Sequence, residues 1–140
     1  MNVRLQLKLK TMWEKTKKII NWVLTGLVSF IFIGSAISKF TANAEALKIA
    51  EGFGLNAQTY ILLGVLEIIS VFLFIIPRTG ILGTLLLTAY IGGAIATHLE
   101  HGQSIVAPCI IQGFLWIVAI YRFPELKSRI LNLKMKKWNI

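Results

Sequence analysis

The chain has 140 residues, of which 56% are hydrophobic and 15% charged, and its net charge is +9. Its charged fraction is below the quarter or so that is usual in soluble domains, and its length allows a single domain. A nucleic-acid-binding protein spreads its cations over a folded surface or along a recognition helix, whereas here Lys and Arg lie almost entirely at the two ends. Composition therefore excludes nucleic acid as the expected partner and favours the lipid bilayer.

Four apolar segments are long enough to cross a bilayer, which takes about 20 helical residues. They are residues 19–38, 60–76, 81–97 and 105–121. Backbone polar groups find no water in lipid, so each segment is predicted to be a helix. The predicted fold is all-α, a transmembrane four-helix bundle with basic amphipathic segments at both ends. Its expected parts are a basic N-terminal segment (1–18), the bundle (19–121) and a basic C-terminal tail (122–140).

A tight turn is predicted between the second and third segments, at Pro77-Arg78-Thr79-Gly80. Proline ends the incoming helix and glycine supplies backbone freedom. With four crossings, Arg78 lies on the same side as both basic ends. Cytoplasmic segments of membrane proteins are enriched in Lys and Arg. Both termini are therefore expected on the cytoplasmic side.

Two features at the ends of the chain allow a second interpretation. Ala42-Asn43-Ala44 resembles a signal-peptide cleavage site, but the apolar stretch before it is longer than the 7–15 residues of such signals. The tails interleave apolar residues with cations, and those of the C-terminal tail step by three and four along one helical face: Phe123, Leu126, Ile130 and Leu133. Both tails fit interfacial helices on anionic lipid and equally fit plain topology anchors.

Glu67 is the ionisable residue that stands out at membrane depth, near the middle of the second segment. Such residues are costly in lipid and usually face the bundle interior. Tyr90 and Gln112 fall at a similar depth in the third and fourth segments, so a hydrogen-bonded layer of these three residues is predicted. The alternative is that Glu67 only joins helices through a hydrogen bond to Gln112.

Further polar residues fall in the outer half of the bundle. Ser35 and Lys39 are four residues apart and share one helical face, and Tyr90 and His98 share another. We predict a polar cleft with Glu67 at its floor and with Lys39 and His98 at its mouth. The alternatives are that Lys39 extends to the interface and that His98 is a solvated residue of the loop.

Metal binding is not expected, because His98 and His101 lack further ligands. Cys109 is the single cysteine, so no internal disulfide can form; it is interpreted as a packing thiol. Several glycines are expected to let the helices approach closely: Gly26, Gly34, Gly64, Gly80, Gly83, Gly92 and Gly93.

Four short motifs follow one another along the chain: GSAISKF (34–40), LE (66–67), IPRT (76–79) and GGAIATHL (92–99). In this order and spacing the sequence resembles the DoxX-like family of small four-helix membrane proteins, from about Trp22 to Tyr121. The resemblance implies a multi-pass protein of the bacterial plasma membrane. It places Lys39, Glu67, Arg78 and His98 on the family's polar positions without assigning them catalytic roles.

The resemblance also bears on ligands and partners, because some members of this broad group are linked to quinone-dependent sulfur oxidation or to redox complexes. It implies quinone as a cofactor or ligand and membrane or redox proteins as partners, whereas a lone cysteine argues against a thiol relay. The leading hypothesis is an accessory or redox-linked subunit that binds a small hydrophobic molecule in the outer cleft. The alternatives are a small proton-coupled transporter and a purely structural assembly subunit.

Overall fold

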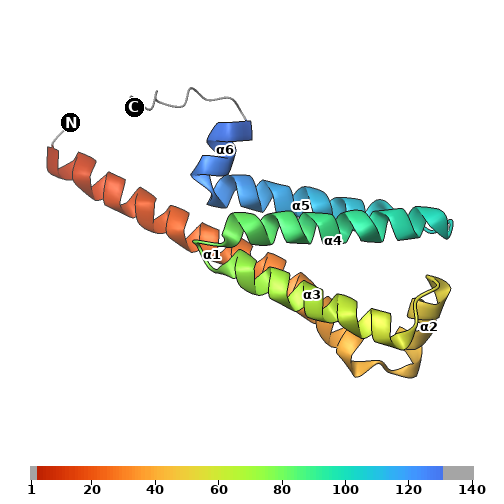
Figure 1. The fold of residues 1–140 in the computed structure, drawn as a ribbon. Coiled ribbons are helices and arrows are strands. Elements are labelled where there is room, and N and C mark those ends of the chain that lie inside the picture. Colours follow the sequence, from red (N-terminus) through yellow and green to blue (C-terminus); the bar gives the residue numbers. More distant parts are fainter. Residues whose placement is uncertain (1–2, 131–140) are drawn as a thin grey trace, which may run out of the picture.

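The computed structural model describes residues 3–130, and within that range the regular structure is helical throughout (Figure 1). The helices are α1 (Val3–Thr41), α2 (Ala44–Gly52), α3 (Ala57–Ile75), α4 (Gly80–Glu100), α5 (Val106–Arg122) and α6 (Pro124–Ile130). The all-α prediction is confirmed. Leu133, the last residue of the apolar face expected in the C-terminal tail, lies outside the described residues.

Within residues 3–130, three helices are long and apolar enough to cross a membrane, namely α1, α3 and α4. A fourth candidate is α5 taken together with α6, with a bend of 109° between them. The 17 residues of α5 are about 25 Å long as a helix, at the short end of what a crossing needs. The protein is thus a multi-pass membrane protein with three or four candidate spans.

The basic N-terminal segment is continuous with the first span. At 39 residues, α1 is about 58 Å long, roughly twice the hydrocarbon thickness of a bilayer. Its first half projects beyond the other helices (Figure 1), and the cations and apolar residues there are all exposed. The expected boundary near residue 18 therefore falls inside one unbroken helix.

The bundle is built from neighbouring antiparallel helices. Helix α1 packs along α3, α3 along α4 and α4 along α5, and α5 also contacts α1. The core between them is apolar and includes Phe32, Phe74, Leu87 and Leu115. We call its two ends the α2 end, where α2 and the α4–α5 connection lie, and the turn end, where residues 76–79 and α6 lie (Figure 1).

Helix α2 was not predicted from the sequence. Asn43 accepts a hydrogen bond at its Oδ1 from the Ala46 amide (2.8 Å) and so caps the helix. Ala46 and Ala50 are buried against Tyr60 at the start of α3. This short amphipathic helix therefore packs at the ends of α1 and α3.

Glycines bring the helices together only at some of the expected positions. A Cβ on Gly83 would lie 2.2 Å from the backbone nitrogen of Phe74, and one on Gly64 would lie 3.2 Å from Cβ of Lys39. The prediction is wrong for Gly26, Gly34, Gly92 and Gly93, because a Cβ on any of them would meet nothing within 4 Å. Gly83 and Gly64 thus allow close approach at the α3–α4 and α1–α3 contacts.

Gly80 permits the close approach expected of it, but it does not supply the backbone freedom expected in the turn. It is the first residue of α4 and is not among the residues with positive φ. A Cβ there would lie 2.2 Å from Cζ of Phe123. At the same end, the Arg122 guanidinium donates to the Ile75 carbonyl and lies 4.9 Å from the ring centroid of Phe74. These contacts tie α5 to the end of α3.

Candidate functional site

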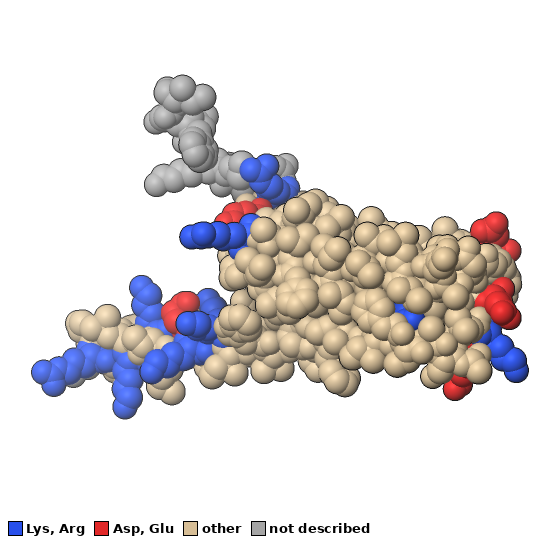
Figure 2. All heavy atoms as spheres, turned by 60° about the horizontal axis from the view of Figure 1, so that its bottom comes forward, with Lys and Arg blue, Asp and Glu red and all other residues tan. Residues whose placement is uncertain are grey.

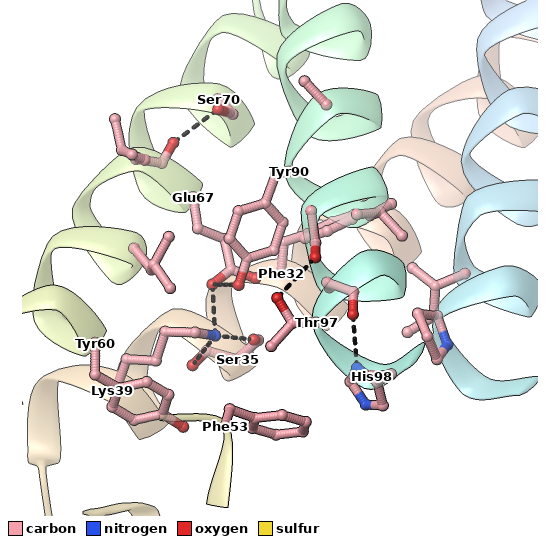
Figure 3. Close-up of a pocket in the computed structure, with 18 of the residues that line it drawn as sticks. Phe32, Ser35, Lys39, Phe53, Tyr60, Glu67, Ser70, Tyr90, Thr97 and His98 are labelled. Carbon is pink, nitrogen blue, oxygen red and sulfur yellow. Dashed lines mark hydrogen bonds and ion pairs between the residues drawn. The ribbon is translucent and has the colours of Figure 1, made fainter. Parts of the chain in front are cut away.

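A cavity of about 640 Å³ opens between α1, α3, α4 and α5, toward the α2 end (Figure 3). This volume is within the range of small-molecule sites. Its walls are mainly apolar and include Phe32, Leu63 and Ile91. Of the six residues predicted for the polar cleft, Ser35, Lys39, Glu67, Tyr90 and His98 line it.

A buried ion pair lies in the cavity wall. The Lys39 ammonium is 2.9 Å from Oε2 of Glu67, and the two side chains are 9% and 1% exposed. Lys39 also donates to the hydroxyl of Ser35 at 2.6 Å. The tyrosine hydroxyl of Tyr90 donates to the same Glu67 oxygen at 3.3 Å (Figure 3). A charged pair in an apolar wall is costly unless it is well hydrogen-bonded, and here several partners surround it.

Helix direction explains why Lys39 does not extend to the membrane interface. Side chains on an α-helix lean toward its N-terminus. Helix α1 runs toward the α2 end and α3 runs away from it (Figure 1). Lys39 therefore leans toward the bundle centre and Glu67 leans toward the α2 end, so they meet between the helices. Lys39 lies beside Glu67 in the wall of the cavity, whereas the sequence placed it at the mouth of the cleft, apart from Glu67.

Two tyrosine rings flank the ammonium group. Nζ of Lys39 lies 5.7 Å from the ring centroid of Tyr60 and 5.6 Å from that of Tyr90. At these distances an aromatic face attracts a cation. The Tyr60 ring is buried between α2 and the cavity. The rings and Glu67 together compensate the charge of Lys39 out of water.

His98 lies at the α2 end of the cavity. Its Nδ1 is 2.7 Å from the Ala94 carbonyl one turn earlier in α4, so Nδ1 carries a proton and donates. Its ring lies 4.8 Å, centroid to centroid, from Phe53 in the α2–α3 connection. His98 is therefore held against the cavity on two sides and is not a freely solvated loop residue.

Gln112 does not join the polar layer. Within residues 3–130 no hydrogen bond joins Gln112 to Glu67, and the buried Oε1 atom of Gln112 has no partner. Gln112 is also absent from the cavity wall, where α5 contributes Ala107, Pro108 and Ile111. Similar depth in two segments does not fix the face on which a side chain points.

The remaining predicted residues lie outside the cavity. Pro77 and Arg78 are exposed in the turn at the other end of the bundle. Cys109 is exposed on α5, so the packing interpretation is wrong. Among the described residues, no three His, Cys, Asp or Glu side chains are grouped so as to hold a metal ion.

Sequence reasoning named Tyr90 but left two further aromatic residues out of the predicted cleft. Tyr60 and Phe53 line the cavity, but Phe53 belongs to a connection that gave no helical signal. A clue for Tyr60 is its spacing of seven residues from Glu67, which places both on one face of α3.

Neither the curated proteins nor the solved structures contain a match to this sequence. The sequence pattern of the DoxX-like family matches residues 23–120, which include α3, α4 and every cavity residue. The chain belongs to the DoxX-like family.

Proposed function

We propose that this protein binds a small, neutral, hydrophobic molecule with a polar head in the cavity, and that it serves as an accessory or redox-linked membrane subunit. The observation that carries the proposal is the buried Lys39–Glu67 pair in the wall of an otherwise apolar cavity. Replacing a buried ion pair by apolar residues is often neutral or stabilising. If the two residues served only to hold α1 against α3, apolar side chains would do so at least as well as two charges.

The charge balance of the site supports a neutral ligand. Lys39 offsets the charge of Glu67 inside the protein, so neither charge is free to bind an oppositely charged head group. Ammonium and tyrosine hydroxyl groups donate hydrogen bonds, and a carboxylate accepts them. A head group with a carbonyl or a hydroxyl can form hydrogen bonds with these groups. A quinone carries carbonyls in its oxidised state and hydroxyls in its reduced state, so it fits in both states.

The proton-coupled transporter is the less favoured function. A membrane acid that exchanges a proton for a cationic substrate needs access to that substrate. Glu67 is 1% exposed and already bonded to Lys39 and Tyr90. A cationic substrate would have to displace Lys39, which reaches Glu67 from the neighbouring helix. The structural-subunit hypothesis accounts for the pair only as a contact between α1 and α3, which apolar side chains would supply as well.

We also propose the bacterial plasma membrane as the location, with both ends of the chain in the cytoplasm. In Figure 2 most of the cations lie at the end that carries the N-terminal half of α1 and α6, with a few acids among them, whereas at the opposite end acidic residues predominate. The wide belt between them is almost entirely without charge. The excess of Lys and Arg on cytoplasmic segments then orients the bundle.

The test is to purify the wild-type protein, Glu67→Gln and Glu14→Gln in mild detergent and to identify co-purifying quinones, lipids and proteins by mass spectrometry. Glu14 is the matched control, an exposed acid that pairs with Lys17 at 3.6 Å. A small molecule that is retained by the wild type and Glu14→Gln but lost from Glu67→Gln supports the ligand site. The same partner protein in all three samples, without a specific small molecule, supports the structural subunit.

A further inference from the structure

The α2 end of the cavity is covered by protein. Ile49 of α2 and Phe53 and Leu55 of the following connection line the cavity. The Phe53 ring lies against His98 and also 5.9 Å, centroid to centroid, from His101. The α2–α3 connection is thus packed onto the end of α4. This cover lies between the cavity and the water on that side of the membrane.

The lining residues that are also exposed mark where the cavity opens. On α3 these are Leu66 and Ile69, and on α4 they are Leu86, Ala89 and Gly93. Helices α3 and α4 are neighbours, so these five residues form one continuous apolar edge. The other exposed lining residues occur singly, on three different helices: Ile31, Ile49 and Ala107.

Small residues keep this edge open. Ala89 and Gly93 are four residues apart and so lie on one face of α4, and a Cβ on Gly93 would meet nothing within 4 Å. The edge lies along the two spans, between the cover at the α2 end and the close contact of Gly83 with Phe74 near the turn. It therefore faces the hydrocarbon of the bilayer and not an aqueous phase.

We propose that the ligand enters sideways from the bilayer between α3 and α4, and that its apolar tail lies in this opening while its head reaches the Lys39–Glu67 pair. This inference rests on the proposed function and narrows its ligand class. The site selects neutral amphiphiles that are dissolved in the membrane and carry a tail, because a tail stays in contact with lipid while the head is bound. Molecules taken from the aqueous phase meet the cover formed by α2 and Phe53.

Two neighbouring glycines supply a matched pair of variants. Gly93 lines the cavity and Gly92 does not, whereas both are exposed on α4 and both have free space for a Cβ. We would reconstitute the wild type, Gly93→Leu, Gly92→Leu and Ala107→Leu, the last at an exposed lining residue of α5, in liposomes. Binding of two probes is measured, a benzoquinone with a long isoprenoid tail and the same ring without a tail. Thermal unfolding of each variant checks that it is folded.

Gly93→Leu is expected to bind the tailed probe about tenfold more weakly, with the tail-less ring affected less than about twofold. Gly92→Leu is expected to bind both probes as the wild type does. Equal effects of the two variants, or unchanged binding of the tailed probe by Gly93→Leu, would overturn lateral entry between α3 and α4. So would selective loss of the tailed probe in Ala107→Leu, which places the entry beside α5. A wild type that binds neither probe instead contradicts the proposed function.

Discussion

The side chains of Lys39 and Glu67 meet because each leans toward the N-terminus of its own helix and the two helices run in opposite directions. The pair is linked to Ser35, Tyr60 and Tyr90 by hydrogen bonds and ring contacts (Figure 3). Removing one partner leaves the other charge buried and uncompensated. Removing both leaves an apolar wall of similar volume. Comparing the single and double variants in stability and in ligand binding therefore distinguishes a ligand site from a helix contact.

Glu67→Gln and Lys39→Met are each expected to lower stability by about 3–5 kcal/mol, because either leaves an unpaired polar or charged group in the wall. Lys39→Met/Glu67→Leu is expected to regain most of that loss while losing the ligand. Thermal unfolding in detergent, with and without the ligand identified by mass spectrometry, measures both effects. Lys17→Met is the control, since it breaks an exposed pair that contributes about 1 kcal/mol at most.

A double variant as unstable as the single ones would contradict this expectation. It would mean that the pair stabilises the fold beyond what an apolar replacement can supply. The residues would then hold α1 against α3, and the structural-subunit hypothesis would gain.

At the scale of the helices, α3 and α4 approach most closely near the turn. Gly83 lies against the backbone of Phe74, and the Thr79 hydroxyl donates to the Leu73 carbonyl at 2.9 Å. From there the cavity residues of both helices follow toward the α2 end. The tight contact at the turn therefore fixes the angle at which the two walls of the cavity separate.

Gly83→Ala is expected to lower the unfolding temperature and to weaken ligand binding, because its Cβ would overlap backbone atoms of Phe74 that cannot rotate away. Overpacking of this kind costs about 1–3 kcal/mol. Gly92→Ala is the control on the same helix. It meets nothing within 4 Å, and it is expected to be neutral or to stabilise by up to about 1 kcal/mol through helix propensity. Equal unfolding temperatures of the two variants would contradict the close α3–α4 contact.

At the scale of the whole molecule, an uncharged belt separates a basic end from an end with acidic residues (Figure 2). The belt carries exposed large apolar side chains on every long helix, including Phe30, Leu62, Leu85 and Ile117. In water such a surface would cause aggregation, whereas in lipid it is the contact surface. Beyond the belt, the N-terminal half of α1 carries its cations clear of the bundle.

The proposed orientation is tested with single cysteines in a Cys109→Ser background, since the chain has one native cysteine. Gln103→Cys in the α4–α5 connection and Arg78→Cys in the turn are both exposed. In intact bacterial spheroplasts, a membrane-impermeant maleimide is expected to label Gln103→Cys, and to label Arg78→Cys only after lysis. Labelling of both after lysis is the control. The reverse pattern would place the basic ends outside the cytoplasm.

The sequence alone determined the helical class, the family and the approximate bounds of α3, α4 and α5, whereas α1 begins at Val3, well before the predicted residue 19. Long uncharged runs leave the backbone no alternative to helices in lipid, so α3 over Ala57–Ile75 and α4 over Gly80–Glu100 agree closely with the predicted 60–76 and 81–97. It also identified Glu67, Lys39, Tyr90 and His98 as candidate site residues, because polar groups at membrane depth are costly.

Only the tertiary structure decided which of these residues meet. Depth along a segment follows from counting residues, but the direction of a side chain depends on how each helix rotates against its neighbours. Lys39 therefore joined Glu67, and Gln112, expected at the same depth, did not. Tyr60 and Phe53 entered the site through α2 and its connection, a short amphipathic element held by packing against α3 that a hydropathy pattern does not signal.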